Sequence, residues 1–277
     1  LYWAGVGKGL MGAKLKDNML ELAGEPQGIQ QLPEGMKEGP FLFERNGIYY
    51  FTFPHVIRET EALVYAMGPS PLGPFEYKGI IMDEHPSKCW TNHHSILEYK
   101  GQWYLFYHHN DLSPDFDKNR SIRADRLAFN EDGTIRPVIP TLRGVGVVPA
   151  TREIQLDRYS AVSDEGAAVD FLDDAKPFEG WETILDAEGA WVRFDRVDFG
   201  GQGVTTARIR ARSADGCTLA IAASSGDVPI QTQVRIPQNA DWQAVTAGIG
   251  MTTSGVHDVT VLLVGPGRVE IDWIQFE

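Results

Sequence analysis

Apolar and polar residues alternate along most of the chain, and short turn sequences separate the alternating runs. Gly, Pro, Asn-Gly and Asp-Gly stand between these runs, and no long apolar stripe follows the 3.6-residue period of an amphipathic helix. Alternation with a period of two is the pattern of strands that are buried on one face. The pattern therefore predicts an all-β protein.

The first half contains an internal repeat. Residues 39–51 align with residues 93–105 at an offset of 54 residues, and each copy predicts a strand, a hairpin turn with glycine and an aromatic strand. A second hairpin is expected after each copy. Its strands are expected at residues 63–67 and 75–78 in the first copy and at 122–125 and 134–136 in the second. Four strands in a unit of about 50 residues are typical of a β-propeller blade.

Residues 1–30 are expected to form the end of a preceding blade. The chain then holds roughly two and a half blades, fewer than the four or more of a closed propeller. We therefore interpret residues 1–141 as an incomplete, N-terminally truncated propeller.

Composition changes after the repeat. Eight of the nine Tyr residues precede residue 110, and the Gly-rich and Pro-containing residues 142–152 predict a linker. Residues 153–277 show short strands at close spacing, which is typical of a β-sandwich of the jelly-roll type. These strands are expected at residues 191–194, 204–212, 218–222, 256–264 and 270–276.

The acidic net charge excludes some classes of binding partner. The chain has a formal net charge of −13, and its second part, residues 151–277, carries 20 acidic and 10 basic residues. Such a surface repels phosphate backbones and anionic lipids, so we expect no nucleic-acid or membrane partner. The two cysteines lie far apart in the sequence and are expected to be unpaired thiols.

The repeat makes Glu38 and Asn92 equivalent, each directly before its blade's first strand. Inner strands of a propeller start near the central channel, where desolvation raises the pKa of a carboxyl group. Glu38 is therefore the candidate general acid, with an ordinary surface glutamate as the alternative. His93 and His94 are adjacent in a strand and must point to opposite faces.

No spacing of zinc ligands and no nucleotide-binding motif is present, so no cofactor is expected for catalysis. Arg120 has two equally supported interpretations. It either clamps a sugar or carboxylate in the channel or forms a structural ion pair with Asp117 or Asp125.

Several motifs in the first half resemble glycoside hydrolase family 43. They are the residues Glu-Gly-Pro at 38–40, Gly-Ile-Tyr-Tyr at 47–50, Ser-Pro-Leu-Gly-Pro-Phe at 70–75, Thr-Asn-His-His-Ser-Ile at 91–96 and Trp-Tyr-Leu-Phe-Tyr-His at 103–108. The resemblance implies a five-bladed propeller that removes arabinose or xylose from plant polysaccharides with inversion. By this resemblance Glu38 matches the general acid, and His93 matches an axial histidine that holds a central water or cation.

The same resemblance implies the sugar contacts. Asn92 and Arg120 match positions that contact the sugar, and we also expect Trp90 and Phe53 to bind substrate.

An inverting glycosidase needs a second carboxylate as base. In the family that base, and an Asp that tunes the acid, occupy positions that would precede residue 1. If the polypeptide begins at Leu1, we expect hydrolysis to be lost or very weak.

The second half resembles carbohydrate-binding module family 6. The matching segments are residues 189–192, 197–200, 240–243, 254–258 and 271–276. Trp242 and Trp181 are the candidate sugar-stacking residues. The alternative is that Trp191, Trp242 and Trp273 only pack in the core or at its rim.

The module also departs from its family. Ile184 stands where relatives present an aromatic residue, and Glu270 or Gly267 stands where they present an asparagine, so sugar stacking is weakened. Asp157 and Asp272 match acidic positions that hold a structural calcium ion in related modules.

These inferences lead to one expected function. The chain is expected to be part of an inverting exo-glycosidase that removes α-L-arabinofuranosyl or β-D-xylosyl units from plant polysaccharide of the arabinoxylan or xylan class. The alternatives are a noncatalytic carbohydrate-binding protein and one half of an enzyme assembled from two fragments, with the missing blades supplied in cis or in trans. The polysaccharide substrate favours a secreted or periplasmic protein.

Overall fold

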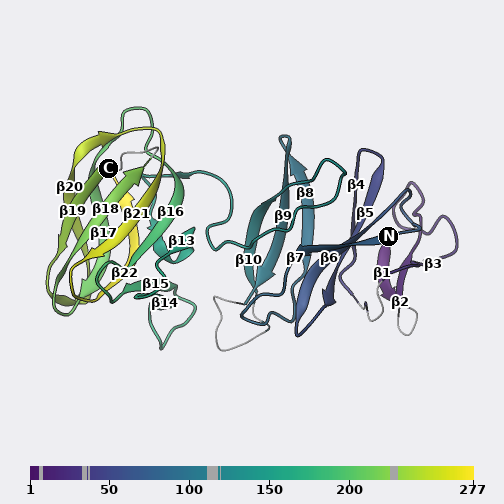
Figure 1. Cartoon of the computed structure of the whole chain (residues 1–277), viewed down its shortest axis with the longest axis horizontal. Helices are drawn as coiled ribbons and strands as arrows, with labels where there is room; N and C mark the ends of the chain where they lie inside the picture. The colour runs from purple at the N-terminus through teal and green to yellow at the C-terminus, as the bar shows by residue number, and fades with distance from the viewer. Residues whose placement is uncertain (6–8, 33–35, 37, 111–117, 119, 225–229) are drawn as a thin grey trace. The chain divides into compact units, whose positions relative to one another are not determined.

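The computed structural model describes residues 1–5, 9–32, 36, 38–110, 118, 120–224 and 230–277 (Figure 1). Strands dominate this part of the chain, and its one helix is the short 3₁₀ helix η1 (Leu156–Arg158). It contains no helix that is both long and apolar enough to cross a membrane. The chain divides into two compact units, Leu1–Pro140 and Thr141–Glu277. The prediction of an all-β protein is confirmed.

The first unit consists of three antiparallel sheets that follow one another in sequence. The first sheet is formed by β1 (Tyr2–Gly5), β2 (Gly9–Gly12) and β3 (Gln27–Gly28). The second is formed by β4 (Phe41–Arg45), β5 (Ile48–Val56), β6 (Glu61–Gly68) and β7 (Glu76–Met82). The third is formed by β8 (His94–Tyr99), β9 (Gln102–His109) and β10 (Ser121–Leu127). Successive sheets of three, four and three strands agree with the predicted partial propeller.

The repeat is visible in the backbone of the two inner hairpins. Asn46 and Gly47 join β4 to β5 with φ angles of 55° and 78°, and Lys100 and Gly101 join β8 to β9 with φ angles of 52° and 77°. Two consecutive residues with positive φ are the mark of a type I′ hairpin turn. The 54-residue offset therefore relates two turns with the same backbone geometry.

The outer edge of the third sheet differs from the prediction. Residues 134–136 do not form a fourth strand, because Phe129 and Ile135 make only an isolated bridge. This loop instead packs on the preceding sheet, where the Tyr50 hydroxyl donates to the Gly133 carbonyl at 2.7 Å and Phe43 stacks on Tyr50 with ring centroids 4.6 Å apart. The aromatic residues of the first half thus fill the space between its sheets.

The second unit is a β-sandwich of two six-stranded sheets. One sheet contains β11 (Val148–Pro149), β13 (Ala161–Val162), β16 (Trp191–Asp198), β18 (Cys217–Ser224), β19 (Ile230–Ile236) and β21 (Val256–Val264). The other contains β12 (Ile154–Gln155), β14 (Ala167–Phe171), β15 (Trp181–Leu185), β17 (Val204–Ser213), β20 (Asn239–Thr253) and β22 (Val269–Phe276). The five strands predicted for this half all fall within strands of the structure.

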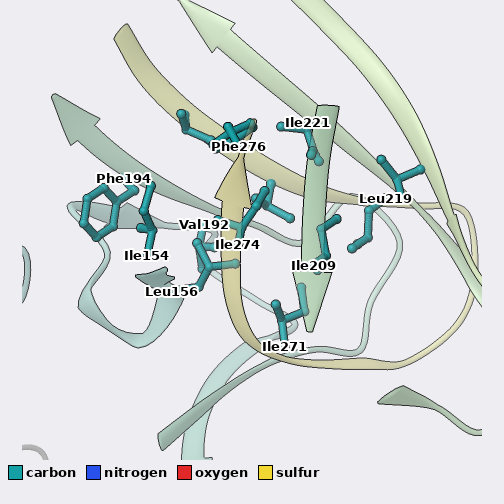
Figure 2. Packing of buried hydrophobic residues seen from close by; sticks show 14 of the residues in the cluster. Ile154, Leu156, Val192, Phe194, Ile209, Leu219, Ile221, Ile271, Ile274 and Phe276 are labelled. Atoms are coloured by element: carbon teal, nitrogen blue, oxygen red, sulfur yellow. The ribbon is translucent and has the colours of Figure 1, made fainter. Parts of the chain in front are cut away.

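The inward-facing residues of these two sheets form one apolar core (Figure 2). Ile209 of β17, Leu219 of β18 and Ile271 of β22 are fully buried in it. The segment predicted as a linker, 142–152, belongs to this unit. Pro149 and its neighbour in β11 pair with β16, and the Arg143 guanidinium lies 4.3 Å from the ring centroid of Phe194.

Candidate functional site

Glu38 lies at the entrance to the first repeat, directly before the Gly-Pro pair that leads into β4. Its side chain is exposed, and its Oε2 atom lies 3.7 Å from Nε2 of His93. Gly39 allows the Glu38 carboxylate and the His93 ring to lie this close together. Its φ is +62°, and a Cβ atom there would lie 2.7 Å from Cδ of Pro54 and 3.3 Å from Nε2 of His93. A side chain at this position would push the His93 ring away from the carboxylate.

Asn92, the repeat equivalent of Glu38, is buried, with 1% of its surface exposed. Its backbone N–H donates to Oε2 of Glu61 at 3.0 Å. Its side-chain Oδ1 and Nδ2 atoms have no hydrogen-bond partner among the described residues. A buried amide with an unused acceptor and unused donors is suited to bond an incoming hydroxyl group or a water molecule.

His93 and His94 face opposite ways, as the strand geometry requires. The His93 side chain is half-exposed and faces Glu38. The His94 Nε2 atom lies 2.6 Å from Oγ1 of Thr52, on the neighbouring strand β5. Burial, with a smaller effect of His93, lowers the pKa of His94 to about 3, so this ring is neutral. Only His93 is presented to Glu38.

The ring centroid of His108 lies 6.4 Å from that of His93. Burial, followed by the positive charge of Arg120, lowers the pKa of His108. The structure therefore brings Glu38 and His93 together, with His108 next to His93, and Arg120 is near enough to His108 for its charge to act on that ring.

The other residues predicted for the substrate site, Trp90 and Phe53, differ in exposure. Trp90 is 44% exposed, two residues before Asn92. Phe53 is fully buried in the core, so its side chain has no free surface for a substrate. Asp117, one suggested partner of Arg120, lies outside the described residues.

Glu61 is the member of this cluster that sequence reasoning missed. It is the first residue of β6 and accepts the Asn92 hydrogen bond described above. Burial, and secondarily the negative charge of Glu38, raise the pKa of Glu61 to about 7, although the Asn92 N–H lowers it. Two carboxylates thus lie close enough for their charges to interact.

A second polar surface covers the outer face of the β14–β15–β22–β17–β20 sheet. Alternation along β17 places Arg208, Arg210 and Arg212 on this face. The guanidinium groups of Arg210 and Arg212 lie 5.0 Å and 4.6 Å from the ring centroid of Trp242. These cation–π contacts hold the indole in place on the sheet.

Arg210 and Arg212 also pair with carboxylates. Arg212 donates to Glu270 and, at 3.2 Å, to Oε2 of Glu182, which is almost completely buried. Burial raises the pKa of Glu182 to about 7 against the opposing effect of Arg212. Burial acts in the same direction on Glu270, but Arg268 and Arg212 outweigh it, and the pKa of Glu270 is lowered.

Two hollows adjoin this face. One, of about 660 Å³, is lined by Trp242, Phe171, Arg212 and carboxylates of several strands. The other, of about 470 Å³, is lined by Trp181, Asp157, Asp272 and Arg210. Trp181 stacks on Phe171 with ring centroids 4.5 Å apart. Both predicted aromatic residues therefore border concave surface.

The side chains around Asp157 and Asp272 do not fit the calcium site implied by the resemblance. Asp157 accepts a hydrogen bond from Nε of Arg158 at 2.8 Å, and Asp272 accepts one from Arg210. No group of three or more His, Cys, Asp or Glu side chains in the described part of the chain could hold a metal ion. Calcium takes six to eight oxygen ligands, whereas here the two carboxylates each accept a hydrogen bond from a guanidinium group.

The first unit is thus built of blade-like sheets with Glu38 and His93 close together, and the second is a sandwich with an aromatic and charged outer face. Residues 1–135 match the family model of glycosyl hydrolases family 43, and residues 163–277 match that of carbohydrate-binding module family 6. The chain thus combines a segment of glycosyl hydrolase family 43 with a family 6 carbohydrate-binding module.

Relatives of known name match different portions of the chain. A xylosidase/arabinosidase of Bacteroides ovatus is 37% identical over 137 residues, which is 44% of this chain and 40% of that protein. An arabinoxylan arabinofuranohydrolase of Paenibacillus polymyxa is 25% identical over 272 residues, covering 86% of this chain and 42% of that protein. The chain therefore spans about two fifths of the length of these relatives.

The fold of both units together has a solved counterpart. The crystal structure of a family 43 arabinoxylan arabinofuranohydrolase from Bacillus subtilis, in complex with cellotetraose, matches 99% of this chain and 60% of its own chain. The TM-score is 0.56 and the sequence identity is 22%. This likeness confirms the fold class.

Proposed function

We propose that this chain contributes the general acid and a sugar-binding module to a glycosidase that removes α-L-arabinofuranosyl or β-D-xylosyl units from plant polysaccharide of the arabinoxylan class. The observation that carries the proposal is the Glu38 carboxyl group, which lies 3.7 Å from Nε2 of His93. The residue before His93 is Asn92, whose buried amide has no hydrogen-bond partner among the described residues. The names of the relatives support the choice of these two sugars.

In the proposed reaction Glu38 donates its proton to the leaving glycosidic oxygen. In this proposal the Asn92 side chain and the exposed Arg120 guanidinium bond sugar hydroxyls. The Asn92 amide has donors and an acceptor without partners among the described residues, and Arg120 is near enough to His108 to lower the pKa of that ring. Inversion requires a base carboxylate about 6.5–9.5 Å from the acid, with a water molecule between base and sugar. We assign the base to blades beyond residues 1–277, in cis or in trans. No cofactor takes part in this chemistry.

The sandwich supplies binding rather than catalysis in this proposal. Trp242 offers an aromatic surface for a sugar ring, and the arginines and carboxylates around it can bond hydroxyl groups. A polysaccharide substrate is too large to enter a cell intact, so we propose that the protein works outside the cytoplasm.

Hydrolysis of aryl α-L-arabinofuranosides and aryl β-D-xylosides tests the proposal. The protein should be expressed from its complete reading frame, as wild type and as Glu38→Gln. A general acid contributes about 10²–10⁴-fold to the rate, so Glu38→Gln should lower kcat by about that factor. Glu44→Gln, an exposed hairpin glutamate in β4, is the matched control and should keep wild-type turnover. Equal turnover in wild type and Glu38→Gln would rule out Glu38 as the acid.

A further inference from the structure

Glu61 joins two segments that are far apart in the sequence. It stands at the start of β6, paired in register with Val56 of β5, and its Oε2 atom accepts the Asn92 backbone N–H across 31 residues of chain. Asn92 directly precedes His93, the residue that faces Glu38. A single hydrogen bond therefore ties the first blade to the segment that carries two predicted sugar-site residues.

The surroundings of Glu61 make this bond its main polar contact. Among the described residues, no ion pair connects Glu61 to a lysine or arginine, and its other charged neighbour is the like-charged Glu38. A half-buried carboxylate gains more from an N–H donor than an exposed one, because water competes less for it. The hydrogen bond is thus suited to fix the position of the Asn92 backbone rather than to neutralise the charge of Glu61.

The Asn92 segment needs such a hold. The Asn92 side chain is buried but has no hydrogen-bond partner among the described residues, so no side-chain hydrogen bond fixes the Asn92 backbone. The contact of His94 with Thr52 holds the following residue, and the bond to Glu61 holds the Asn92 backbone itself. Displacement of this segment would move the Asn92 amide and the His93 ring relative to Glu38.

We propose that Glu61 is a positioning residue for the general acid: by accepting the Asn92 N–H it fixes the 92–93 segment against which Glu38 is aligned. This inference rests on the proposed function. It assigns Glu61 no contact with the substrate and no proton transfer. Its effect depends on the reach of the side chain and on an acceptor atom at its end, and not on negative charge.

The variants Glu61→Gln, Glu61→Asp and Glu61→Ala separate these requirements. Glutamine keeps the reach and an acceptor oxygen but removes the charge, aspartate keeps the charge but shortens the reach by one methylene, and alanine removes both. Glu59→Gln is the matched control, since Glu59 lies two residues earlier, is 68% exposed and pairs with Lys88 at the surface.

The first readout is the dependence of kcat on the leaving group. A 2,4-dinitrophenyl glycoside departs without help from an acid, whereas a methyl glycoside needs a proton. Glu61→Ala and Glu61→Asp should lower kcat about 30-fold on methyl glycosides and less than about threefold on dinitrophenyl glycosides, with KM within about twofold. Glu61→Gln should stay within about fivefold of wild type on both. Equal losses on both substrates, or recovery by aspartate but not by glutamine, would overturn the proposal.

The second readout does not need turnover. Hydrogen exchange of the Asn92 amide should be at least tenfold faster in Glu61→Ala than in wild type or in Glu61→Gln. Unchanged exchange would contradict the contact itself, even if the enzyme is active. Absence of hydrolysis in the wild-type protein would instead contradict the proposed function and, with it, the acid-positioning role. If the alanine variant does not fold, the comparison of Gln with Asp decides.

Discussion

In both the propeller site and the outer face of the sandwich, burial raises the pKa of one carboxyl group to about 7, in Glu61 and in Glu182, but the two regions stabilise these groups differently. In the first, Glu61 lies beside Glu38 and is bonded to a backbone amide, with no lysine or arginine paired to either among the described residues. In the second, Glu182 and Glu270 are paired with Arg212. Carboxylates without cationic partners are typical of reacting sites, whereas networks of paired charges fix side chains in place.

The two regions therefore depend on different contacts. Burial raises the pKa of Glu61 to about 7, and a backbone N–H rather than a cation bonds its carboxylate. A paired carboxylate instead organises its neighbours, here the arginines that hold Trp242. Measurements of stability, of its pH dependence, of sugar affinity and of calcium dependence can test this contrast.

Removing the shared arginine of the sandwich face should have the largest effect. Arg212→Met leaves Glu182 without its cation, and a buried charge that loses its partner costs about 3 kcal/mol of unfolding free energy. The whole loss of unfolding free energy should be seen at pH 8. It should be much smaller at pH 5, where Glu182 can take up a proton. Urea denaturation, followed through amide signals of β17 and β22, measures it. Lys176→Met, which removes exposed ion pairs, should change stability by less than about 0.5 kcal/mol.

The pH dependence of the sandwich should be dominated by Glu182. Its pKa is about 7 in the folded chain against an ordinary value of 4.5, chiefly because of burial. The folded state therefore binds the proton more tightly, and the stabilisation is present below about pH 4.5 and is lost as the pH rises through about 7. From pH 5 to pH 8 the wild type should lose about 2 kcal/mol more than Glu182→Gln. Parallel curves for the two proteins would contradict the assignment.

Some features of the fold and of the candidate site can be predicted from local sequence patterns. The hairpin at Asn46-Gly47 follows from local turn chemistry, and the equivalence of Glu38 and Asn92 follows from the repeat. In the structure Glu38 lies 3.7 Å from His93, the residue that directly follows Asn92. Alternation along β17 likewise predicts which arginines face outward. Local pattern decides these features, so no long-range information is needed.

The features that the sequence did not predict depend on distant contacts. Glu61 meets Asn92 across 31 residues, and Arg212 meets Glu270 across 58. Phe53 is expected from the sequence to bind substrate, but its side chain is fully buried. It lies instead in β5, a central strand that is buried on both faces, where alternation no longer distinguishes core from site.

Trp242 should matter for binding more than for stability. The indole is held by Arg210 and Arg212 at the surface of the sheet, so Trp242→Ala removes a contact surface and little core. We expect the affinity for xylo- or cello-oligosaccharides to fall about fivefold, equivalent to about 1 kcal/mol. Isothermal titration calorimetry measures this change. Trp191→Ala, in β16 of the other sheet, is the control and should leave the affinity unchanged.

Calcium should have the smallest effect. In the sandwich the carboxylates of Asp157 and Asp272 are already bonded to Arg158 and Arg210, so a cation would have to displace two guanidinium groups to reach them. The midpoint of thermal unfolding should therefore differ by less than about 2 °C between millimolar calcium and excess chelator, well below the 4–8 °C that 1 kcal/mol produces in a domain of about 100 residues. Arg158→Ala frees the Asp157 carboxylate and is the variant in which a calcium-dependent rise in the midpoint should emerge. A large rise in the wild type would show that a metal ion, and not arginine, balances these carboxylates.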